Sequence, residues 1–578
     1  MKAPDIWPEV MAILRANAGP VATAFALGCA ISLLTVPAQM AWQHAQVFSQ
    51  EGWFRNFGFP EPWLGIWKAQ GGFSFSNASF FLSAFGLLQN SLFWAAISFV
   101  AIFIRRLVSG DLPVLLLPVY VVALGFARVQ LEYQMAVAAF GSIVRFAQID
   151  PFSYAHIVTY FTMALLLFPA VVVLVSRLPF REIFRLSCLG LPIILMPPIL
   201  DNYVLHRPVI YNFYTPGLFP QPLNPLSYLT VVSTGIKLEA WVVAGATFTY
   251  LLYRTRSIPR SVAAVLAVVL AFVAVTTPIV TDQFHLMLSQ PQFFAGFLIL
   301  TYLLIIGDLG LAQPKMGTTI IRRMRLRGIH FPAMVVFGAF LVHPAILNLG
   351  ILEDYGLVLA GAFIAFLIWQ SATVFDDIYD RSEMQGNSMY LCYGLLTVVM
   401  AVLAAIPFGP LPLLLTVFAA YLAIDYARLR SKHYVFSGVV IGIASSLSFL
   451  LGSSIPITSP ATQQPIAGIA LALFAVFSGG SLVKDIATVE EDKRSGVCTV
   501  FTKFEMRKVL PVVSTFVAAG CILPVVFLNA LPDLILFAAI GCGNWLLIVL
   551  MKSRSYRPVL ALYFIEGLWI FYRMFLSH

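Results

Sequence analysis

Residues 465–496 read PIAGIALALFAVFSGGSLVKDIATVEEDKRSG, and this stretch decides the fold class. Its first part, residues 465–483, carries no charge and is long enough to cross a bilayer as a helix of roughly 20 residues. Its second part, from Lys484 to Gly496, is densely charged. An apolar run that ends in such a cluster predicts a transmembrane helix whose last turns reach the membrane surface.

The composition of the whole chain agrees with a membrane location. Of its 578 residues, 60% are hydrophobic and only 11% are charged, which excludes a soluble globular protein. The net charge of +9 does not indicate a nucleic-acid partner, because most Lys and Arg lie in short connections where they set membrane orientation. The six cysteines form no CxxC pair, which argues against a disulfide framework or a zinc site.

Apolar runs predict about 17 transmembrane helices. The basic connections alternate with connections that carry few cations, which places the N-terminus in the cytoplasm of a multi-pass protein, expected in a bacterial inner membrane. We therefore expect an all-α integral membrane protein with about eight helices in residues 1–312, a basic cytoplasmic linker at 313–330 and about nine helices in residues 331–578. The expected spans lie near residues 21–40, 88–104, 111–127, 155–176, 185–201, 228–252, 261–281, 291–311, 331–350, 356–374, 388–407, 411–427, 434–452, 465–483, 507–528, 531–550 and 556–574.

A second acidic cluster, VFDDIYDRSE at residues 374–383, also follows an apolar span. Counting the spans places both clusters on the cytoplasmic side. Asp377 and Asp380 are three residues apart, so they share one face of a helix and could share an ion. Asp485 and Asp492 lie two turns apart along another face. Because Mg²⁺ takes one or two carboxylates together with phosphate oxygens, the clusters predict a Mg²⁺ site for a diphosphate.

These motifs resemble those of the UbiA superfamily of intramembrane prenyltransferases. VFDDIYDRSE is similar to the first aspartate-rich motif, NDxxDxxxD, and KDIATVEEDKRSGVCT at residues 484–499 is similar to the second, KDxxDxxxDxxxGxxT. Between them, Tyr426 and Arg430 are similar to the YxxxK element, with Arg in place of Lys. The resemblance covers roughly residues 325–578 and implies a nine-helix UbiA-like bundle.

The two acidic motifs depart from the family pattern at three positions. Asp376 stands where the family usually has Asn, Met384 takes the place of the last acid of the first motif, and Thr488 replaces the middle acid of the second. Oxygen ligands remain close to these positions, including Glu383 beside Met384. Mg²⁺ binding is therefore still expected, whereas the identity of the substrates stays open.

The resemblance implies Mg²⁺-dependent transfer of an isoprenoid group from a (poly)prenyl diphosphate to a lipophilic acceptor, with release of diphosphate. Mg²⁺ held by the same acids would also serve phosphoribosyl-type transfer from a phosphoribosyl diphosphate to a polyprenyl phosphate, in lipid-linked sugar synthesis. A further alternative is a transporter or flippase of a lipid-linked intermediate, with a non-catalytic UbiA-like half. The expected partners are thus an isoprenoid lipid and the bilayer.

The expected site combines acids and cations from both clusters and the segment between them. The expected catalytic residues are Asp377, Asp380, Asp485 and Asp492. The expected metal-associated residues are Asp376, Asp377, Asp380, Glu383, Asp485, Glu490 and Asp492. The expected diphosphate contacts are Tyr426, Arg430, Lys484 and Lys493.

We recognise no family resemblance in residues 1–312. They contain a polar group formed by Asp201, Asn202, His206 and Arg207, next to a proline-rich segment. This group has two interpretations: an outward-facing site for a lipid-linked sugar or acceptor, or helix caps within an aromatic interfacial belt.

Overall fold

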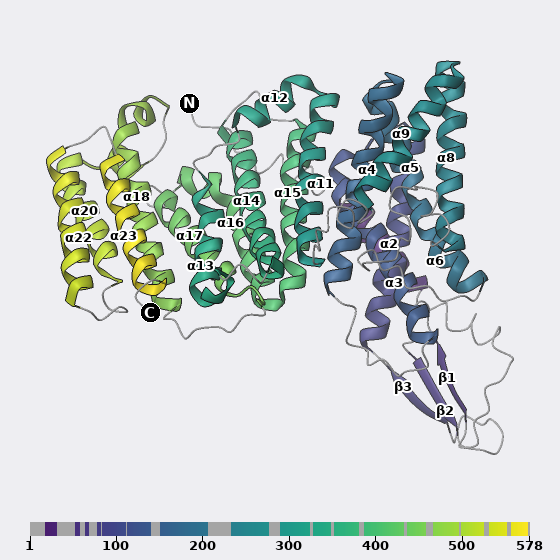
Figure 1. Ribbon diagram of the computed structural model, residues 1–578, viewed down its shortest axis with the longest axis horizontal. Coiled ribbons are helices and arrows are strands. Elements are labelled where there is room, and N and C mark those ends of the chain that lie inside the picture. The colour runs from purple at the N-terminus through teal and green to yellow at the C-terminus, as the bar shows by residue number, and fades with distance from the viewer. Residues whose placement is uncertain are drawn as a thin grey trace. The chain divides into compact units, whose positions relative to one another are not determined.

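The structure is a computed structural model of the chain, and it divides into two compact units (Figure 1). The N-terminal unit lies within Trp7–Met287 and Leu303–Gly317, and the C-terminal unit is built mainly from Leu288–Tyr302 and Thr318–His578. The structure describes residues 18–31, 53–57, 64–68, 78–82, 84–110, 112–139, 151–205, 233–276, 290–323, 328–347, 352–380, 387–432, 436–457, 466–495, 499–524, 531–551 and 557–575.

The N-terminal unit is mainly a helical bundle. Its longer helices are α2 (Ala84–Val108), α3 (Leu117–Ala139), α4 (Pro151–Ser176), α5 (Phe180–Gly190), α8 (Thr234–Thr255) and α9 (Ile258–Thr276). Helix α4 packs against α3, α5 and α9. Val172 of α4, Ile183 of α5 and Leu251 of α8 meet in one buried apolar cluster, so the α4 region is the core of this unit.

Short elements interrupt the bundle after α5. They are η3 (Leu191–Leu195), α6 (Met196–Pro198) and the π-helix η4 (Ile199–Val204). Prolines stand within the first two of these elements, where they remove backbone donors and prevent a regular helix. The expected span near 185–201 is therefore a broken helix.

A small antiparallel sheet is the one departure from helical structure among the described residues. Its strands are β1 (Trp53–Phe57), β2 (Leu64–Lys68) and β3 (Ala78–Leu82), in the order β1-β2-β3. Trp53 pairs with Lys68, and Leu64 pairs with Leu82. Aromatic and β-branched residues favour such short strands when the segments are too short to cross a bilayer as helices.

The division between the units falls within α11 (Gln290–Ala312), after Tyr302. It is followed by α12 (Pro314–Arg323), a helix that lies in the segment expected to be a basic linker. Pro314 opens α12 at a position where its missing N–H costs nothing.

The C-terminal unit is a sequence of long helices. They are α13 (His330–Val342), α14 (Leu352–Asp380), α15 (Ser388–Ala405), α16 (Pro410–Lys432), α17 (Phe436–Ser453), α18 (Ile466–Ser495), α20 (Met506–Ile522), α22 (Leu531–Met551) and α23 (Arg557–Phe575), with a short α19 (Val500–Lys503). These helices correspond to the spans expected after residue 330. Helix α17 packs against α13 and α18, and α20 packs against α18 and α22.

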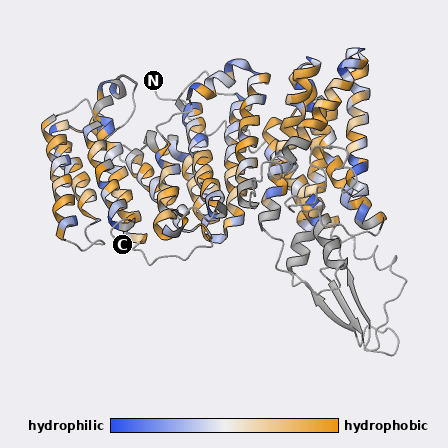
Figure 2. Cartoon of the chain, in the orientation of Figure 1, coloured by the Kyte–Doolittle hydropathy of each residue, from blue (hydrophilic) through white to orange (hydrophobic). Residues whose placement is uncertain are grey.

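The fold class predicted from the sequence, an all-α integral membrane protein, is confirmed. Within the described ranges, nine stretches are long and apolar enough to cross a membrane, and six shorter apolar helices accompany them. Figure 2 shows hydrophobic residues along the length of most helices and hydrophilic residues mainly near helix ends. The predicted number of 17 membrane-spanning helices is not confirmed, because several helices fall short of a full span.

Local sequence signals set several helix ends in the C-terminal unit. The Asn387 side chain accepts hydrogen bonds from the backbone N–H groups of Met389 and Tyr390, which caps the start of α15. Gly409 has a φ of 100°, a left-handed value that suits glycine, and it separates α15 from α16. Thr499 and Thr502 form a reciprocal capping box at α19, directly after the second charged cluster.

Glycine permits the close approach of α13 and α17. A Cβ atom added at Gly452 would lie 1.9 Å from the backbone oxygen of Val335, and one added at Gly338 would lie 2.3 Å from that of Phe449. Small residues allow such contacts between membrane helices, where packing rather than hydrophobicity drives association. The pair α13 and α17 is therefore held at close range beside the cavity described next.

Candidate functional site

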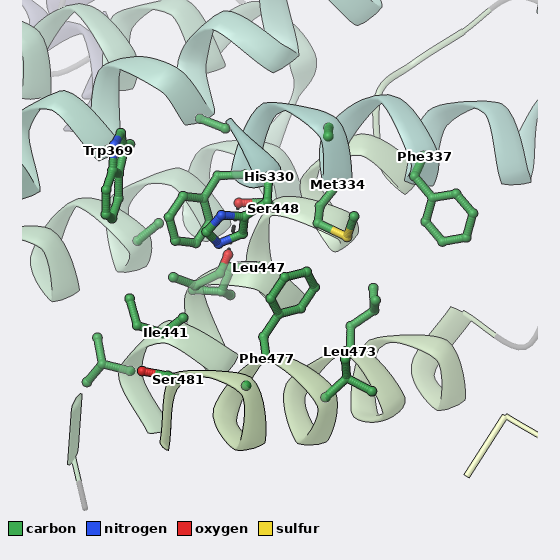
Figure 3. Close-up of a pocket in the computed structure, with 18 of the residues that line it drawn as sticks. His330, Met334, Phe337, Trp369, Ile441, Leu447, Ser448, Leu473, Phe477 and Ser481 are labelled. Atoms are coloured by element: carbon green, nitrogen blue, oxygen red, sulfur yellow. Dashed lines mark hydrogen bonds between the residues drawn. The ribbon is translucent and has the colours of Figure 1, made fainter. Parts of the chain in front are cut away.

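A cavity of about 860 Å³ lies within the C-terminal unit. Its walls come from α13, α14, α16, α17, α18 and α23. Most of the lining is aliphatic or aromatic, as Figure 3 shows for Met334, Phe337 and Leu473. Cavities of this size and lining are typical of binding sites for small molecules and lipids.

One helix forms a long wall of the cavity. Ile469, Leu473, Phe477, Gly480 and Lys484 all line it, and their spacing of three to four residues keeps them on one face of α18. At 1.5 Å per residue, this face is about 22 Å long. The wall is apolar from Ile469 to Phe477 and ends in a cation at Lys484.

Polar side chains from three helices meet at one end of the cavity. Asp376 of α14, Tyr426 of α16 and Lys484 of α18 all line it, and each lies in the last part of its helix. Because α15 and α17 each turn the chain back by a short connection, the ends of α14, α16 and α18 face the same way. The cavity thus has a polar end, defined by Asp376, Tyr426 and Lys484, and an apolar body.

His330 and Phe477 form an aromatic layer in the cavity wall, with Phe477 about two helical turns before Lys484 on α18. Their rings stack with centroids 5.0 Å apart and an interplanar angle of 16° (Figure 3). Trp369 also lines this part of the cavity, and its ring lies 6.5 Å from that of His330. Flat aromatic surfaces here can pack against an extended unsaturated chain.

The two neighbouring acids of the first cluster have different surroundings. Asp376 lines the cavity, whereas Asp377 is 3% exposed and accepts a hydrogen bond of 3.0 Å from the Tyr390 hydroxyl of α15. Successive residues on a helix point about 100° apart, and here Asp376 faces the cavity while Asp377 is held toward α15. Asp376, expected only as a metal-associated acid, is therefore the first-cluster acid that reaches this cavity among the described side chains.

In the second charged cluster, too, some residues line the cavity and others lie outside it. Lys484 lines the cavity, while Asp485 is half-buried and does not belong to the lining. Glu490 and Lys493 are exposed on the last turns of α18. The structure therefore brings Asp376, Tyr426 and Lys484 together and places Asp377, Asp485, Glu490 and Lys493 outside the lining.

Four other expected residues have no described side chain. Asp380, Arg430 and Asp492 lie on α14, α16 and α18, where only the backbone is described, and Glu383 lies outside the described residues. Asp380 stands one turn beyond Asp376 and Asp377, at the end of α14. Within the described part of the chain, no group of three or more His, Cys, Asp or Glu side chains could hold a metal ion.

The donor chemistry at the polar end nevertheless fits a metal–diphosphate complex. Mg²⁺ is commonly held by one or two carboxylates together with phosphate oxygens from the substrate, and a preformed protein cage is not required. Asp376 supplies a carboxylate and Lys484 a cation at this end. The carboxylates at positions 380, 485 and 492 lie on the same helices.

Several cavity residues were not identified from the sequence. They include Trp369, Thr416, Tyr563 and Glu566, each of which carries a buried polar atom with no hydrogen-bond partner among the described residues. Glu566 had a signal in the sequence, because it is an acid within the apolar stretch ALYFIEGLWI at residues 561–570. Trp369, Thr416 and Tyr563 resemble ordinary helix residues and gave no such signal.

The polar group expected in the N-terminal unit has a structural contact. Asp201 is buried in the π-helix η4, and its carboxylate accepts a 2.8 Å hydrogen bond from the backbone N–H of Gly235. This contact satisfies a free donor in the first turn of α8. The side chain of Asn202 is not described, and His206 and Arg207 lie outside the described residues.

The C-terminal unit is therefore a membrane-embedded helical bundle with an amphipathic cavity. Residues 387–570 match the model of the UbiA prenyltransferase family, which confirms the resemblance to this family for that segment. The matched segment contains Tyr426, Lys484 and the second charged cluster, and it begins just after the first.

Comparisons with individual proteins add little to this family match. No curated protein matches the chain. One solved structure, described as "Structural and mechanistic insights into the biosynthesis of Digeranylgeranylglyceryl phosphate synthase in membranes", is similar at 18% identity and a TM-score of 0.35. The similarity covers 45% of this chain and 96% of that one. At this TM-score the likeness supports no argument about the present chain.

Proposed function

We propose that the C-terminal half is a Mg²⁺-dependent intramembrane prenyltransferase. It transfers an isoprenoid group from a (poly)prenyl diphosphate to a lipophilic acceptor and releases diphosphate. In this proposal, residues 331–578 form the catalytic domain, residues 313–330 form a cytoplasmic linker, and residues 1–312 form a separate membrane domain. The polar end of the cavity then opens toward the cytoplasm, where water-soluble diphosphate and Mg²⁺ are available.

The observation that carries the proposal is the division of one cavity into a polar end and a long apolar body. The polar end combines Asp376, Tyr426 and Lys484, and the apolar wall of α18 continues from it. A prenyl diphosphate has the same division, with a charged head and a hydrocarbon tail. Burial of the tail provides affinity in proportion to its apolar area, while the head remains in a polar environment.

The chain's own residues at the polar end have distinct roles in this reaction. The Lys484 ammonium attracts the diphosphate oxygens, and the Tyr426 hydroxyl donates a hydrogen bond to them. Asp376 contributes an oxygen ligand for Mg²⁺, with Asp380, Asp485 and Asp492 as the further acids of the proposed site. When bound, Mg²⁺ supplies charge neutralisation for the departing diphosphate. The aromatic layer below keeps water from the allylic carbon from which diphosphate departs.

The proposal is tested by diphosphate release from the purified full-length chain in lipid nanodiscs. The donor panel pairs prenyl diphosphates of several lengths, or phosphoribosyl diphosphate with polyprenyl phosphate, with a lipid extract as the acceptor source. We expect release from a prenyl donor in Mg²⁺, loss of release in EDTA, and recovery when Mg²⁺ is restored. Release from phosphoribosyl diphosphate alone would replace the proposal with phosphoribosyl transfer, and no release from any donor would overturn the transferase assignment.

A further inference from the structure

A series of buried tyrosines leads from the first acidic cluster to α11. Tyr390 and Tyr393 of α15 and Tyr302 of α11 are almost fully buried. The hydroxyl oxygens of Tyr302 and Tyr393 lie 3.0 Å apart and share a hydrogen bond, in which either can be the donor. The Tyr393 ring stacks on the Tyr390 ring with centroids 6.3 Å apart, and the Tyr390 hydroxyl donates to Asp377. Contacts between side chains thus run continuously from α11 to an acid of the cluster.

Tyr302 also contacts the helix that carries this acid. Its ring packs edge to face against Phe363 and Phe366 of α14, with centroids 5.7 Å and 5.4 Å away. Phe366 follows Phe363 by three residues and Asp377 follows Phe366 by eleven, so all three lie on one face of α14. The Tyr302 side chain therefore contacts both of the helices whose hydrogen bond holds Asp377.

The helices α14 and α15 are closely packed near Asp377. A Cβ atom added at Gly394 would lie 2.8 Å from the Cγ1 atom of Val374. Gly394 directly follows Tyr393, and Val374 is three residues before Asp377. Because close-packed interiors transmit strain, a rotation of α15 at Tyr393 would also move the Tyr390 hydroxyl and Asp377.

The hydroxyl pair adds a directional contact that ring packing alone would not supply. Phenylalanine at either position, Tyr302 or Tyr393, would fill nearly the same space and leave no polar atom to be paired within the bundle. A hydrogen bond requires a narrow range of distances and angles, and side-chain hydrogen bonds between membrane helices hold them in contact. The Tyr302–Tyr393 bond therefore fixes the rotation of α15, as the Tyr390–Asp377 bond fixes that of α14.

This support comes from outside the segment expected to be catalytic. Tyr302 lies before the expected catalytic domain at residues 331–578 and before the segment that matches the family, residues 387–570. Leu288–Tyr302 nevertheless belongs to the C-terminal unit. A helix outside the family segment is thus part of the unit that contains the cavity.

We infer that Tyr302 and Tyr393 are positioning residues of the transferase. Through Tyr390 they hold Asp377, and with it Asp376, in the orientation that binds a Mg²⁺–diphosphate complex. Neither tyrosine lines the cavity, so both act through α14 and not by contact with a substrate. The identity of the bound complex rests on the proposed function, whereas the contacts that hold the two acids do not.

The test uses the full-length chain in nanodiscs and compares Tyr302→Phe, Tyr393→Phe and the double variant with the unmodified chain. The first measurement is the Mg²⁺ concentration that gives half-maximal diphosphate release at saturating prenyl diphosphate. We expect it to rise about threefold to tenfold in each single variant. KM for the donor at saturating Mg²⁺ should stay unchanged, because the contacts with the tail and with Lys484 are not altered.

The double variant tests whether the two tyrosines act through one bond. It should require no more Mg²⁺ than the single variants, since both changes remove the same hydrogen bond. Rises that add in the double variant would overturn the inference. An unchanged Mg²⁺ requirement in both single variants would also overturn it and leave the proposed transferase in place.

A second measurement is independent of turnover. Binding of Mn²⁺, used as a probe for the Mg²⁺ site, is followed by electron paramagnetic resonance with inorganic diphosphate and without a prenyl donor. We expect the Mn²⁺ affinity to fall about threefold to tenfold in each single variant. If the unmodified chain releases no diphosphate from any donor, the proposed function fails, and weaker Mn²⁺ binding in both variants still supports the positioning role. Equal affinity in all chains, or no Mn²⁺ binding by the unmodified chain, would overturn the inference.

Ile540→Val is the control for a general loss of stability. Ile540 is buried on α22, where it packs with Cys521 and Phe537 and not with the tyrosines. Loss of a buried methylene destabilises a protein, so we expect an earlier denaturant midpoint with an unchanged Mg²⁺ requirement. A rise equal to that of Tyr302→Phe would overturn the inference, because destabilisation alone would then explain both results.

Discussion

The Tyr390 hydroxyl of α15 donates a 3.0 Å hydrogen bond to the Asp377 carboxylate of α14, and both side chains are almost fully buried. This bond fixes the rotation of the last turns of α14, because Asp377 is held toward α15. Its neighbour Asp376 is thereby turned toward the cavity. A hydrogen bond between two helices therefore leaves Asp376, rather than its neighbour Asp377, facing the cavity.

Removal of the Tyr390 hydroxyl should destabilise the C-terminal unit. In Tyr390→Phe, a buried carboxylate loses a donor, and we expect a loss of about 1–3 kcal/mol in the free energy of unfolding. Denaturant unfolding in detergent, followed by tryptophan fluorescence, measures this quantity. Tyr421→Phe is the matched control, since Tyr421 on α16 is 58% exposed and its substitution should change stability by no more than about 0.5 kcal/mol. Equal losses in the two variants would contradict the role given to the bond.

Loss of a single acid should strongly reduce turnover both at Asp376, which lines the cavity, and at Asp377 and Asp485, which hold neighbouring positions in the two motifs. We expect Asp376→Ala to reduce diphosphate release at least about a hundredfold, because it removes charge stabilisation at the departing group. Asp377→Ala and Asp485→Ala should also abolish turnover without preventing membrane insertion, as the motifs predict. Initial rates in nanodiscs provide the measurement. Glu505→Ala, at an acid whose side chain is 72% exposed beside α20, should retain full activity. Substantial turnover in all three aspartate variants would reject the proposed Mg²⁺ site.

Lys484 should act mainly on the affinity for the donor. Lys484→Ala removes a cation from the polar end of the cavity, and we expect KM for the prenyl diphosphate to rise about tenfold or more. Lys484→Arg should restore part of the affinity, because guanidinium also binds phosphate oxygens. Lys508→Ala serves as the control, since that lysine is 78% exposed and pairs with Glu505. An unchanged KM in Lys484→Ala would place the diphosphate elsewhere.

The apolar body should set the length of the isoprenoid chain. Ala472 lies on the cavity face of α18 between Ile469 and Val476, and Ala472→Phe fills the apolar body without touching the polar end. We expect activity with long donors to fall at least about tenfold relative to a ten-carbon donor, because the longer tail no longer fits. The ratio of kcat/KM between donors measures the change. Leu471→Phe is the adjacent control, because Leu471 is 55% exposed on the outer face of the helix. The same shift in both variants would show that the cavity does not hold the tail.

The membrane class and most helices of this protein were predictable from the sequence, since apolar runs such as residues 465–483 identify a spanning helix by transfer free energy alone. The small sheet of β1, β2 and β3 was not predicted. Its strands pair with their neighbours along the chain, but short aromatic runs are ambiguous between strand and helix by themselves. The broken helix after α5 was also not predicted, because a hydropathy average does not take into account that prolines interrupt helical hydrogen bonding.

The sequence allowed a set of candidate site residues to be proposed, but not their geometry. The sequence by itself determined that acids and cations gather where apolar spans end, and that their spacing resembles one family. Only the tertiary structure decided that Asp376 and Lys484 line the cavity while Asp377 and Asp485 do not, and that Glu566 joins it from α23. The physical reason is that hydropathy is a sum over local residues, whereas the direction in which a side chain points depends on how each helix is rotated by its packing against the others.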